Sequence, residues 1–171
     1  MSCMERMALR GKAGSPLPFS FLSRATSLIG RAFAVLVLLA PSAQAQQAKL
    51  PEIQLTAGVN LIHAELADDF PSRMQGLMYR TSLAPNGGML FVFDKPDTQC
   101  MWMKNTLIAL SVAFIGDSGE IVNIADMQPQ TEDPHCAANP VRYALEMEQG
   151  WFARHGFKPG MRLGGLDKLP R

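Results

Sequence analysis

Polar and apolar residues alternate over several short stretches of the chain, and this pattern predicts β-strands. Residues 52–56 (EIQLT) and 60–66 (NLIHAEL) alternate as strands do when one face is buried. A continuous apolar run at 89–93 (MLFVF) is typical of a strand buried on both faces. Further strands are predicted at 99–105, 109–115, 120–127, 141–147 and around 161–163.

Two short helices interrupt the strand pattern. Acidic residues up to Asp69, followed by Pro71, are typical of a helix start, and the spacing of apolar residues predicts a helix from about residue 71 to 79. Gly76 would lie inside this helix, where glycine costs about 1 kcal/mol relative to alanine. We therefore expect another part of the backbone to approach closely there. A second helix is predicted between Gly150 and Gly156.

The number and spacing of these elements indicate the fold class. Seven or eight short strands, with turn signals such as GDSG at 116–119, predict a mainly β fold with one or two short helices. A β-sandwich or a partly open barrel is the expected architecture. The chain of 171 residues has room for one such domain.

The first 45 residues have the features of a signal peptide. They contain five Lys or Arg and one Glu, then an uncharged apolar run at 32–40, then the small-x-small sequence Ala43-Gln44-Ala45. The alternative is an N-terminal membrane anchor, but the apolar run is about half of the ~20 residues needed to span a bilayer. We therefore predict cleavage near Ala45, a linker at 46–51, a single β-rich domain at 52–171, and a periplasmic or secreted protein without stable membrane insertion.

The net charge of the segment that would remain after cleavage argues against some classes of partner. Residues 46–171 contain 11 Lys or Arg and 14 Asp or Glu, so their net charge is −3. A mildly acidic domain with scattered charges argues against a nucleic-acid partner and gives no basic patch for anionic lipids.

Two cysteines remain after residue 45, Cys100 and Cys136. In an oxidising compartment such a pair is most simply one disulfide. It would close a loop of 37 residues, which is worth roughly 3–4 kcal/mol in the chain-entropy model. A reactive thiol pair is the alternative, but no C-x-x-C spacing supports it.

Four motifs together resemble the family known as domain of unknown function 192. They are QGLMYR at 75–80, GMLFVF at 88–93, WMKNTLI at 102–108 and YALE at 143–146. The resemblance covers about residues 52–164. It implies a β-sandwich of jelly-roll type in a family that is commonly exported or lipid-anchored and has no established activity. Ser111 and Met161 stand where the family commonly has Asp, which weakens any hypothesis that needs carboxylates there.

The polar and aromatic residues of these motifs are the candidates for a ligand site. If these residues share one pocket, its Arg and Lys side chains would bind an anionic ligand, Trp102 would form a flat wall and Asn105 would fix the orientation of the ligand. In the alternative interpretation, Arg80 pairs with Glu146 and Asn105 satisfies buried backbone groups. The ligand-binding candidates are Arg73, Arg80, Trp102, Lys104, Asn105 and Glu146.

Catalytic and metal-binding residues are not predicted. The serines and histidines lie in no nucleophile motif. Met101 and Met103 could offer soft ligands to Cu(I), but alternation places Cys100, Trp102 and Lys104 on the opposite strand face. Methionines at this spacing are usually core residues. The sequence therefore predicts no catalytic residue, no metal site and no cofactor.

The function expected from these observations is a non-catalytic ligand-binding or accessory module of the periplasm. Its partner would be a small anionic ligand or an envelope protein. The alternative is a small hydrolase or lyase that acts on an anionic substrate through the Arg, Lys, Asn and Glu cluster.

Overall fold

The structure is a computed structural model that describes residues 50–169, and the predicted signal peptide and most of the predicted linker lie outside them. No helix within residues 50–169 is long and apolar enough to cross a membrane. The elements in chain order are β1 (Glu52–Ala57), β2 (Asn60–Ala67), α1 (Phe70–Gln75), β3 (Gly87–Asp97), β4 (Cys100–Met101), β5 (Leu110–Ile115), β6 (Ile121–Met127), β7 (His135–Cys136), β8 (Val141–Glu148), α2 (Trp151–Arg154) and a 3-10 helix, η1 (Leu166–Lys168).

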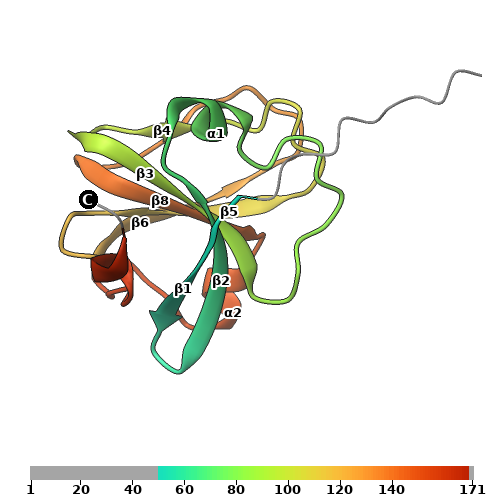
Figure 1. The fold of residues 1–171 in the computed structure, drawn as a ribbon. Helices are drawn as coiled ribbons and strands as arrows, with labels where there is room; N and C mark the ends of the chain where they lie inside the picture. Colours follow the sequence, from blue (N-terminus) through green and yellow to red (C-terminus); the bar gives the residue numbers. More distant parts are fainter. Residues whose placement is uncertain (1–49, 170–171) are drawn as a thin grey trace, which may run out of the picture. The chain divides into compact units, whose positions relative to one another are not determined.

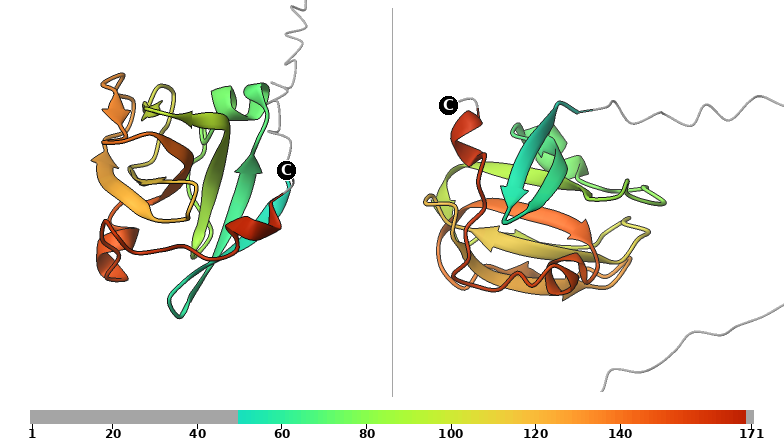
Figure 2. Two further views of the ribbon diagram at one scale, coloured as in Figure 1. Left: turned by 90° about the vertical axis from the view of Figure 1, so that its left-hand side faces the viewer. Right: turned by 90° about the horizontal axis from the view of Figure 1, so that it is seen from below.

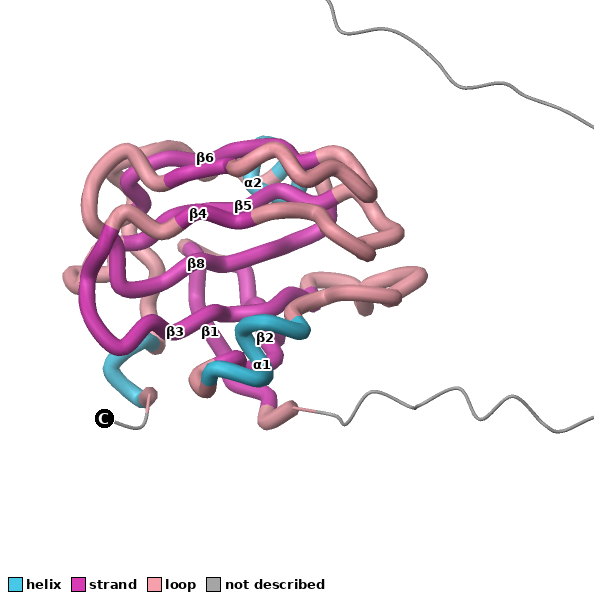
Figure 3. Tube along the Cα trace, turned by 90° about the horizontal axis from the view of Figure 1, so that it is seen from above, coloured by secondary structure: helices cyan, strands magenta, loops and turns pink. Residues whose placement is uncertain are grey.

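Six of the strands form one sheet, which confirms the predicted mainly β fold (Figure 1). Their order is β1-β2-β3-β8-β5-β6, and the sheet does not close into a barrel. β2 and β3 are parallel, and every other neighbouring pair in this sheet is antiparallel. Figure 3 shows β3 and β8 side by side through the middle of the domain. The β1–β2 hairpin projects away from the rest in the left view of Figure 2.

Each face of the sheet carries its own buried cluster, because side chains alternate across the strands. On the face covered by α2, which we name the α2 face, Leu90 and Leu145 pack with Trp151 and Phe152. On the opposite face, named the α1 face, Phe91 packs with residues from the turn after α1 and from β4. Figure 1 shows α1 and β4 on one side of the sheet and α2 on the other.

Helix α1 is shorter than the 71–79 predicted from sequence. Asp69 caps its start by accepting a hydrogen bond of 2.7 Å from the backbone N–H of Ser72. This bond lowers the pKa of Asp69, as the Ser72 hydroxyl also does. Gly76 ends the helix because its backbone is left-handed, with φ of 48°. The predicted close approach at Gly76 comes from a side chain, since an added Cβ would lie 3.3 Å from Cζ of Phe91.

Two predicted strands are shorter than expected. Of residues 99–105 only β4 pairs, because the N–H of Met103 donates to the carbonyl of Thr131 and a turn follows. Residues 161–163 form only one isolated bridge, Glu120 to Arg162. The predicted strands at 109–115, 120–127 and 141–147 correspond to β5, β6 and β8.

The disulfide predicted from the cysteine count is present. β4 pairs with β7 as a separate two-stranded sheet, and Cys100 lies opposite Cys136 in this pairing. Their sulfur atoms are bonded at 2.03 Å. The bond therefore ties together the two short strands that lie beside the α1 face.

Candidate ligand-binding pocket

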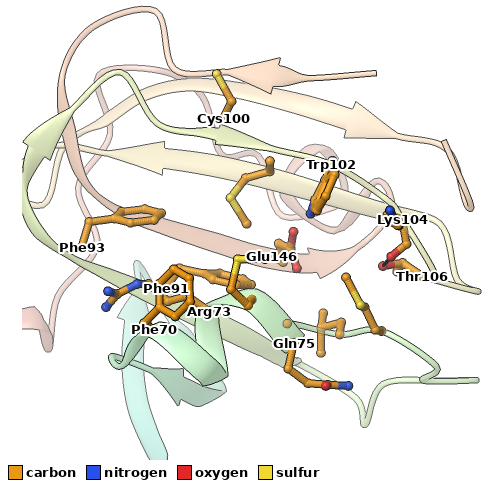
Figure 4. A pocket seen from close by; sticks show the side chains of 15 residues that line it. Phe70, Arg73, Gln75, Phe91, Phe93, Cys100, Trp102, Lys104, Thr106 and Glu146 are labelled. Carbon is orange, nitrogen blue, oxygen red and sulfur yellow. Dashed lines mark hydrogen bonds between the residues drawn. The ribbon is translucent and has the colours of Figure 1, made fainter. Parts of the chain in front are cut away.

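A cavity of about 310 Å³ lies on the α1 face, between α1, β3, β4 and β8 (Figure 4). This volume is at the lower end of the ~300–1,000 Å³ typical of small-molecule sites. Aromatic rings and methionines make up much of the wall. The lining residues are Phe70, Arg73, Met74, Gln75, Gly76, Leu77, Met78, Phe91, Phe93, Cys100, Met101, Trp102, Lys104, Thr106 and Glu146.

Glu146 is the polar group at the centre of this cavity (Figure 4). It comes from β8, where its strand neighbours across the sheet are Met89 of β3 and Val112 of β5. Its side chain is 4% exposed. Burial raises the pKa of Glu146 to about 8. Within residues 50–169 no group forms a hydrogen bond or ion pair with this carboxyl group, so it is buried, unpaired and largely protonated at neutral pH.

Arg73 lines the cavity, but its guanidinium group is already engaged. Nη1 donates to the carbonyl oxygens of Asp68 at 2.7 Å and of Val92 at 2.8 Å. Nη2 lies 3.6 Å from a carboxylate oxygen of Asp94. The side chain therefore ties α1 to β3, and an anion in the cavity would have to compete with these partners.

Trp102 and Lys104 stand together at the rim of the cavity. Nζ of Lys104 lies 5.2 Å from the centroid of the Trp102 ring, within reach of a cation–π contact. The same nitrogen is 3.8 Å from a carboxylate oxygen of Glu132. Both rim side chains are more than 40% exposed, so solvent weakens these charge contacts.

The other two predicted site residues, Arg80 and Asn105, do not line this cavity. Arg80 pairs with Glu65 at 2.7 Å, so the alternative in which it pairs with Glu146 is wrong. Asn105 has φ of 55°, and its exposed side chain reaches Sδ of Met78 at 3.9 Å. Its carbonyl oxygen accepts a bond from the N–H of Tyr79, which connects two loops. The structure thus brings together four of the six candidates: Arg73, Trp102, Lys104 and Glu146.

Sequence reasoning missed the apolar part of the wall. Phe91 and Phe93 alternate along β3 and therefore point to the same side of the sheet as Glu146. Alternation along β8 groups Glu146 with Arg142, Ala144 and Glu148, so the sequence pattern did not indicate that this acid is buried.

Among the described residues that line this cavity, few could bind a metal ion or act as a nucleophile. Met101 and Met103 are buried in the core cluster of the α1 face, as predicted. Met101 also lines the cavity together with Cys100, Trp102 and Lys104, so the predicted separation of these residues onto two strand faces is wrong. The Cys100 sulfur is bonded to Cys136. Among residues 50–169, no three His, Cys, Asp or Glu side chains gather as metal ligands. The described lining contains neither His nor Ser, and the hydroxyl group of Thr106 in it donates to the carbonyl oxygen of Lys104 at 3.4 Å.

Ser111, which departs from the family pattern, lies on the α2 face and has a structural role. Its hydroxyl donates to Asp126, the residue opposite it on β6. The same oxygen accepts a bond of 2.8 Å from the N–H of Gly150, directly before α2. The Ser111 hydroxyl therefore links β5 to β6 and to the residue that begins α2.

Comparisons with known proteins support the family assignment. The model of the family domain of unknown function 192, described as uncharacterized ACR, matches residues 53–165. A crystal structure of a Sinorhizobium meliloti protein, provisionally described as a transcription regulator, is similar with a TM-score of 0.63 and 39% identity, covering 67% of this chain and 92% of that one. A protein of unknown function from Novosphingobium aromaticivorans gives a TM-score of 0.62 and 35% identity, covering 67% of this chain and 84% of that one. No curated protein matches the chain. With most of the folded domain matched by the family model, the chain belongs to the domain of unknown function 192 family.

Proposed function

We propose that the protein is an exported, non-catalytic module that binds one small molecule in the cavity over Glu146. The observation that carries this proposal is the unpaired carboxyl group, buried at the centre of an open, largely apolar cavity. Within residues 50–169 this carboxyl group has no hydrogen-bond partner and faces the cavity, so it is available to a ligand that enters there. Strongly shifted carboxyl groups of this kind are concentrated at functional sites.

Binding rather than turnover fits the lining. A hydrolase or lyase acting through an Arg, Lys, Asn and Glu cluster needs those groups around one substrate, whereas Arg80 and Asn105 lie outside the cavity and Arg73 is engaged. A nucleic-acid partner is not proposed, because residues 46–171 carry a net charge of −3 (11 basic against 14 acidic residues).

A thermal-shift screen of small molecules tests the proposal, because a ligand that binds only the folded state raises the melting temperature. Each molecule that stabilises the wild type is then titrated against Trp102→Ala, which removes part of the cavity wall. The matched control is Leu61→Ala on β2, since Leu61 is 42% exposed, as Trp102 is, and does not line the cavity. We expect Trp102→Ala to weaken binding at least tenfold and Leu61→Ala to leave it unchanged.

Two outcomes would contradict this function. If no class of small molecule stabilises the wild type, or if every stabilising molecule binds both variants equally, the cavity is not a binding site. Recovery of each bound molecule after long incubation, measured by mass spectrometry, separates binding from catalysis. Chemical conversion that depends on Glu146 would favour the enzyme alternative.

Export is tested separately. If the signal peptide is cleaved after Ala45, the N-terminal residue of the protein isolated from the periplasmic fraction is Gln46. N-terminal sequencing of that fraction gives the answer, and an intact N-terminus in the cytoplasmic fraction would contradict export.

A further inference from the structure

The wall of the cavity combines aromatic rings with a carboxyl group. Phe91 and Phe93 come from β3, Trp102 from the loop after β4, and Glu146 from β8 (Figure 4). Aromatic faces carry partial negative charge and attract cations within about 6 Å, and cages of such rings hold quaternary ammonium groups. The methionines of the lining are polarizable and adapt to the shape of a ligand.

Charge inside the cavity is set by Glu146. The titratable groups that face it from neighbouring elements are Arg73 of α1 and Lys104 of the rim. β3 and β5 place Met89 and Val112 beside it. Arg73 is held by two backbone carbonyls and Asp94, and Lys104 lies at the exposed rim near Glu132. Among residues 50–169, the lining therefore offers one acid, Glu146, and two cations that already have partners, with Nζ of Lys104 also 5.2 Å from the centroid of the Trp102 ring.

We propose that the cavity recognises an organic ammonium ion, whose cationic head pairs with Glu146 and whose apolar body lies against Phe91, Phe93 and Trp102. This inference rests on the proposed function, because it names the chemical class of the molecule bound at the same site. An ammonium head would convert the unpaired carboxyl into one half of an ion pair inside the protein, where solvent screens such pairs less than at the surface. A carboxylate placed there would be repelled by the ionised form of Glu146 and could pair only with the protonated form, by accepting a hydrogen bond from it.

Ammonium binding is linked to a proton. Below pH 8 the Glu146 carboxyl is mostly protonated, because burial raises its pKa to about 8. A cation that pairs with the carboxylate must therefore displace this proton. Binding of a permanent cation should release about one proton per site at pH 6.5 and become tighter as the pH rises toward 8.

The test uses three probes with one aromatic body: benzyltrimethylammonium, benzyl alcohol and benzoate. Each is titrated calorimetrically into the wild type at pH 6.5 and pH 8. Glu146→Gln removes the charge with little change of shape. Glu148→Gln is the control, since Glu148 is an exposed acid two positions along the same strand.

We expect the ammonium probe to bind the wild type at least tenfold more tightly than the alcohol or the benzoate at pH 8. Its affinity should fall about tenfold at pH 6.5. At that pH, repeating the titration in buffers of different ionisation enthalpy measures the number of protons released, and we expect close to one. Glu146→Gln should lose at least tenfold in affinity and the pH dependence with it, and Glu148→Gln should match the wild type. Retained affinity for the neutral alcohol shows that the Gln variant is folded.

Several results would overturn the inference. They are absence of binding by the ammonium probe, an equal or higher affinity for benzoate or the alcohol, and an unchanged affinity in Glu146→Gln. If benzoate or the alcohol binds in a way that depends on Trp102, the proposed function stands and only the ligand class is wrong. If no probe binds and the thermal-shift screen finds no stabilising molecule, both the ligand class and the proposed function are wrong.

Discussion

The two faces of one strand, β8, have opposite characters. Leu145 and Met147 point to the α2 face, where the rings of Trp151 and Phe157 stack with their centroids 5.8 Å apart. Ala144 and Glu146 point to the α1 face, which contains a carboxyl group and a cavity of about 310 Å³. Close packing stabilises a fold, whereas unfilled space and unpaired polar groups weaken it. Both faces carry a buried hydrophobic cluster, and the α1 face adds a buried acid at its candidate site.

The covers of the two faces are also held in different ways. α2 is attached by packing and by a hydrogen bond of 2.9 Å from the indole N–H of Trp151 to the side chain of Asn86. The cover of the α1 face has two anchors, the Cys100–Cys136 disulfide and the Arg73 contacts to the backbone of Asp68 and Val92. A face that cannot be fully packed needs such cross-links to stay in place.

The largest expected effect comes from the disulfide. Replacing Cys100 and Cys136 together by Ala opens a loop of 37 residues, given the sequence separation of 36, and should lower the free energy of unfolding by about 4 kcal/mol. Chemical denaturation of the oxidised wild type and the double variant measures this. Hydrogen exchange should show faster opening of β4 and β7 than of β8. Equal rates of opening in β4, β7 and β8 would contradict the idea that the disulfide holds the cover of the α1 face in place.

Leu145→Ala tests the α2 face. Leu145 is fully buried, so truncation leaves a cavity and should lower the free energy of unfolding by about 2–5 kcal/mol. Glu148→Gln on the same strand is exposed and should change it by less than about 0.5 kcal/mol. A loss of less than about 1 kcal/mol for Leu145→Ala would mean that this face is not the main source of stability.

Glu146→Gln tests the α1 face through pH. The folded-state pKa of about 8 lies above the ordinary 4.5, so between these values the folded protein holds a proton that the unfolded chain has released. Stability from this group is complete below about pH 4.5 and is lost as the pH rises to 8. The slope is at most about 1.4 kcal/mol per pH unit.

The measurement is the difference in unfolding free energy between wild type and Glu146→Gln. We expect near equality at pH 5 and a more stable variant at pH 7, by roughly 2–3 kcal/mol. A difference that does not change between these pH values would show that Glu146 is already paired in the folded protein.

The smallest expected effect belongs to the rim. Lys104→Gln removes an exposed charge that lies 3.8 Å from Glu132, and exposed ion pairs contribute about 0–1 kcal/mol. Its unfolding free energy should stay within about 0.5 kcal/mol of the wild type. A larger loss would show that the rim supports the fold and is not simply the edge of the cavity.

Local sequence patterns predicted the fold well and the site in part. Alternation placed Ile62 and Leu66 on one buried face, and the cysteine count indicated the disulfide. The ends of helices and strands were less predictable. Gly76, for example, ends α1 by adopting a positive φ, which the spacing of apolar residues does not reveal. Arg80 could not be assigned from its motif, since its partner Glu65 lies 15 residues away on β2. Such pairings depend on which strands become neighbours.

The order of strands in the sheet has a consequence for how the chain folds. β8 lies between β3 and β5, although it is the last long strand in the sequence. β3 and β5 therefore have no shared partner until residues 141–148 reach them, and pairings so distant in sequence slow folding. We expect β8 to join the sheet last and to carry the acid at position 146 into the interior at that step. Alkaline pH, which charges it, should therefore slow the closing step of refolding.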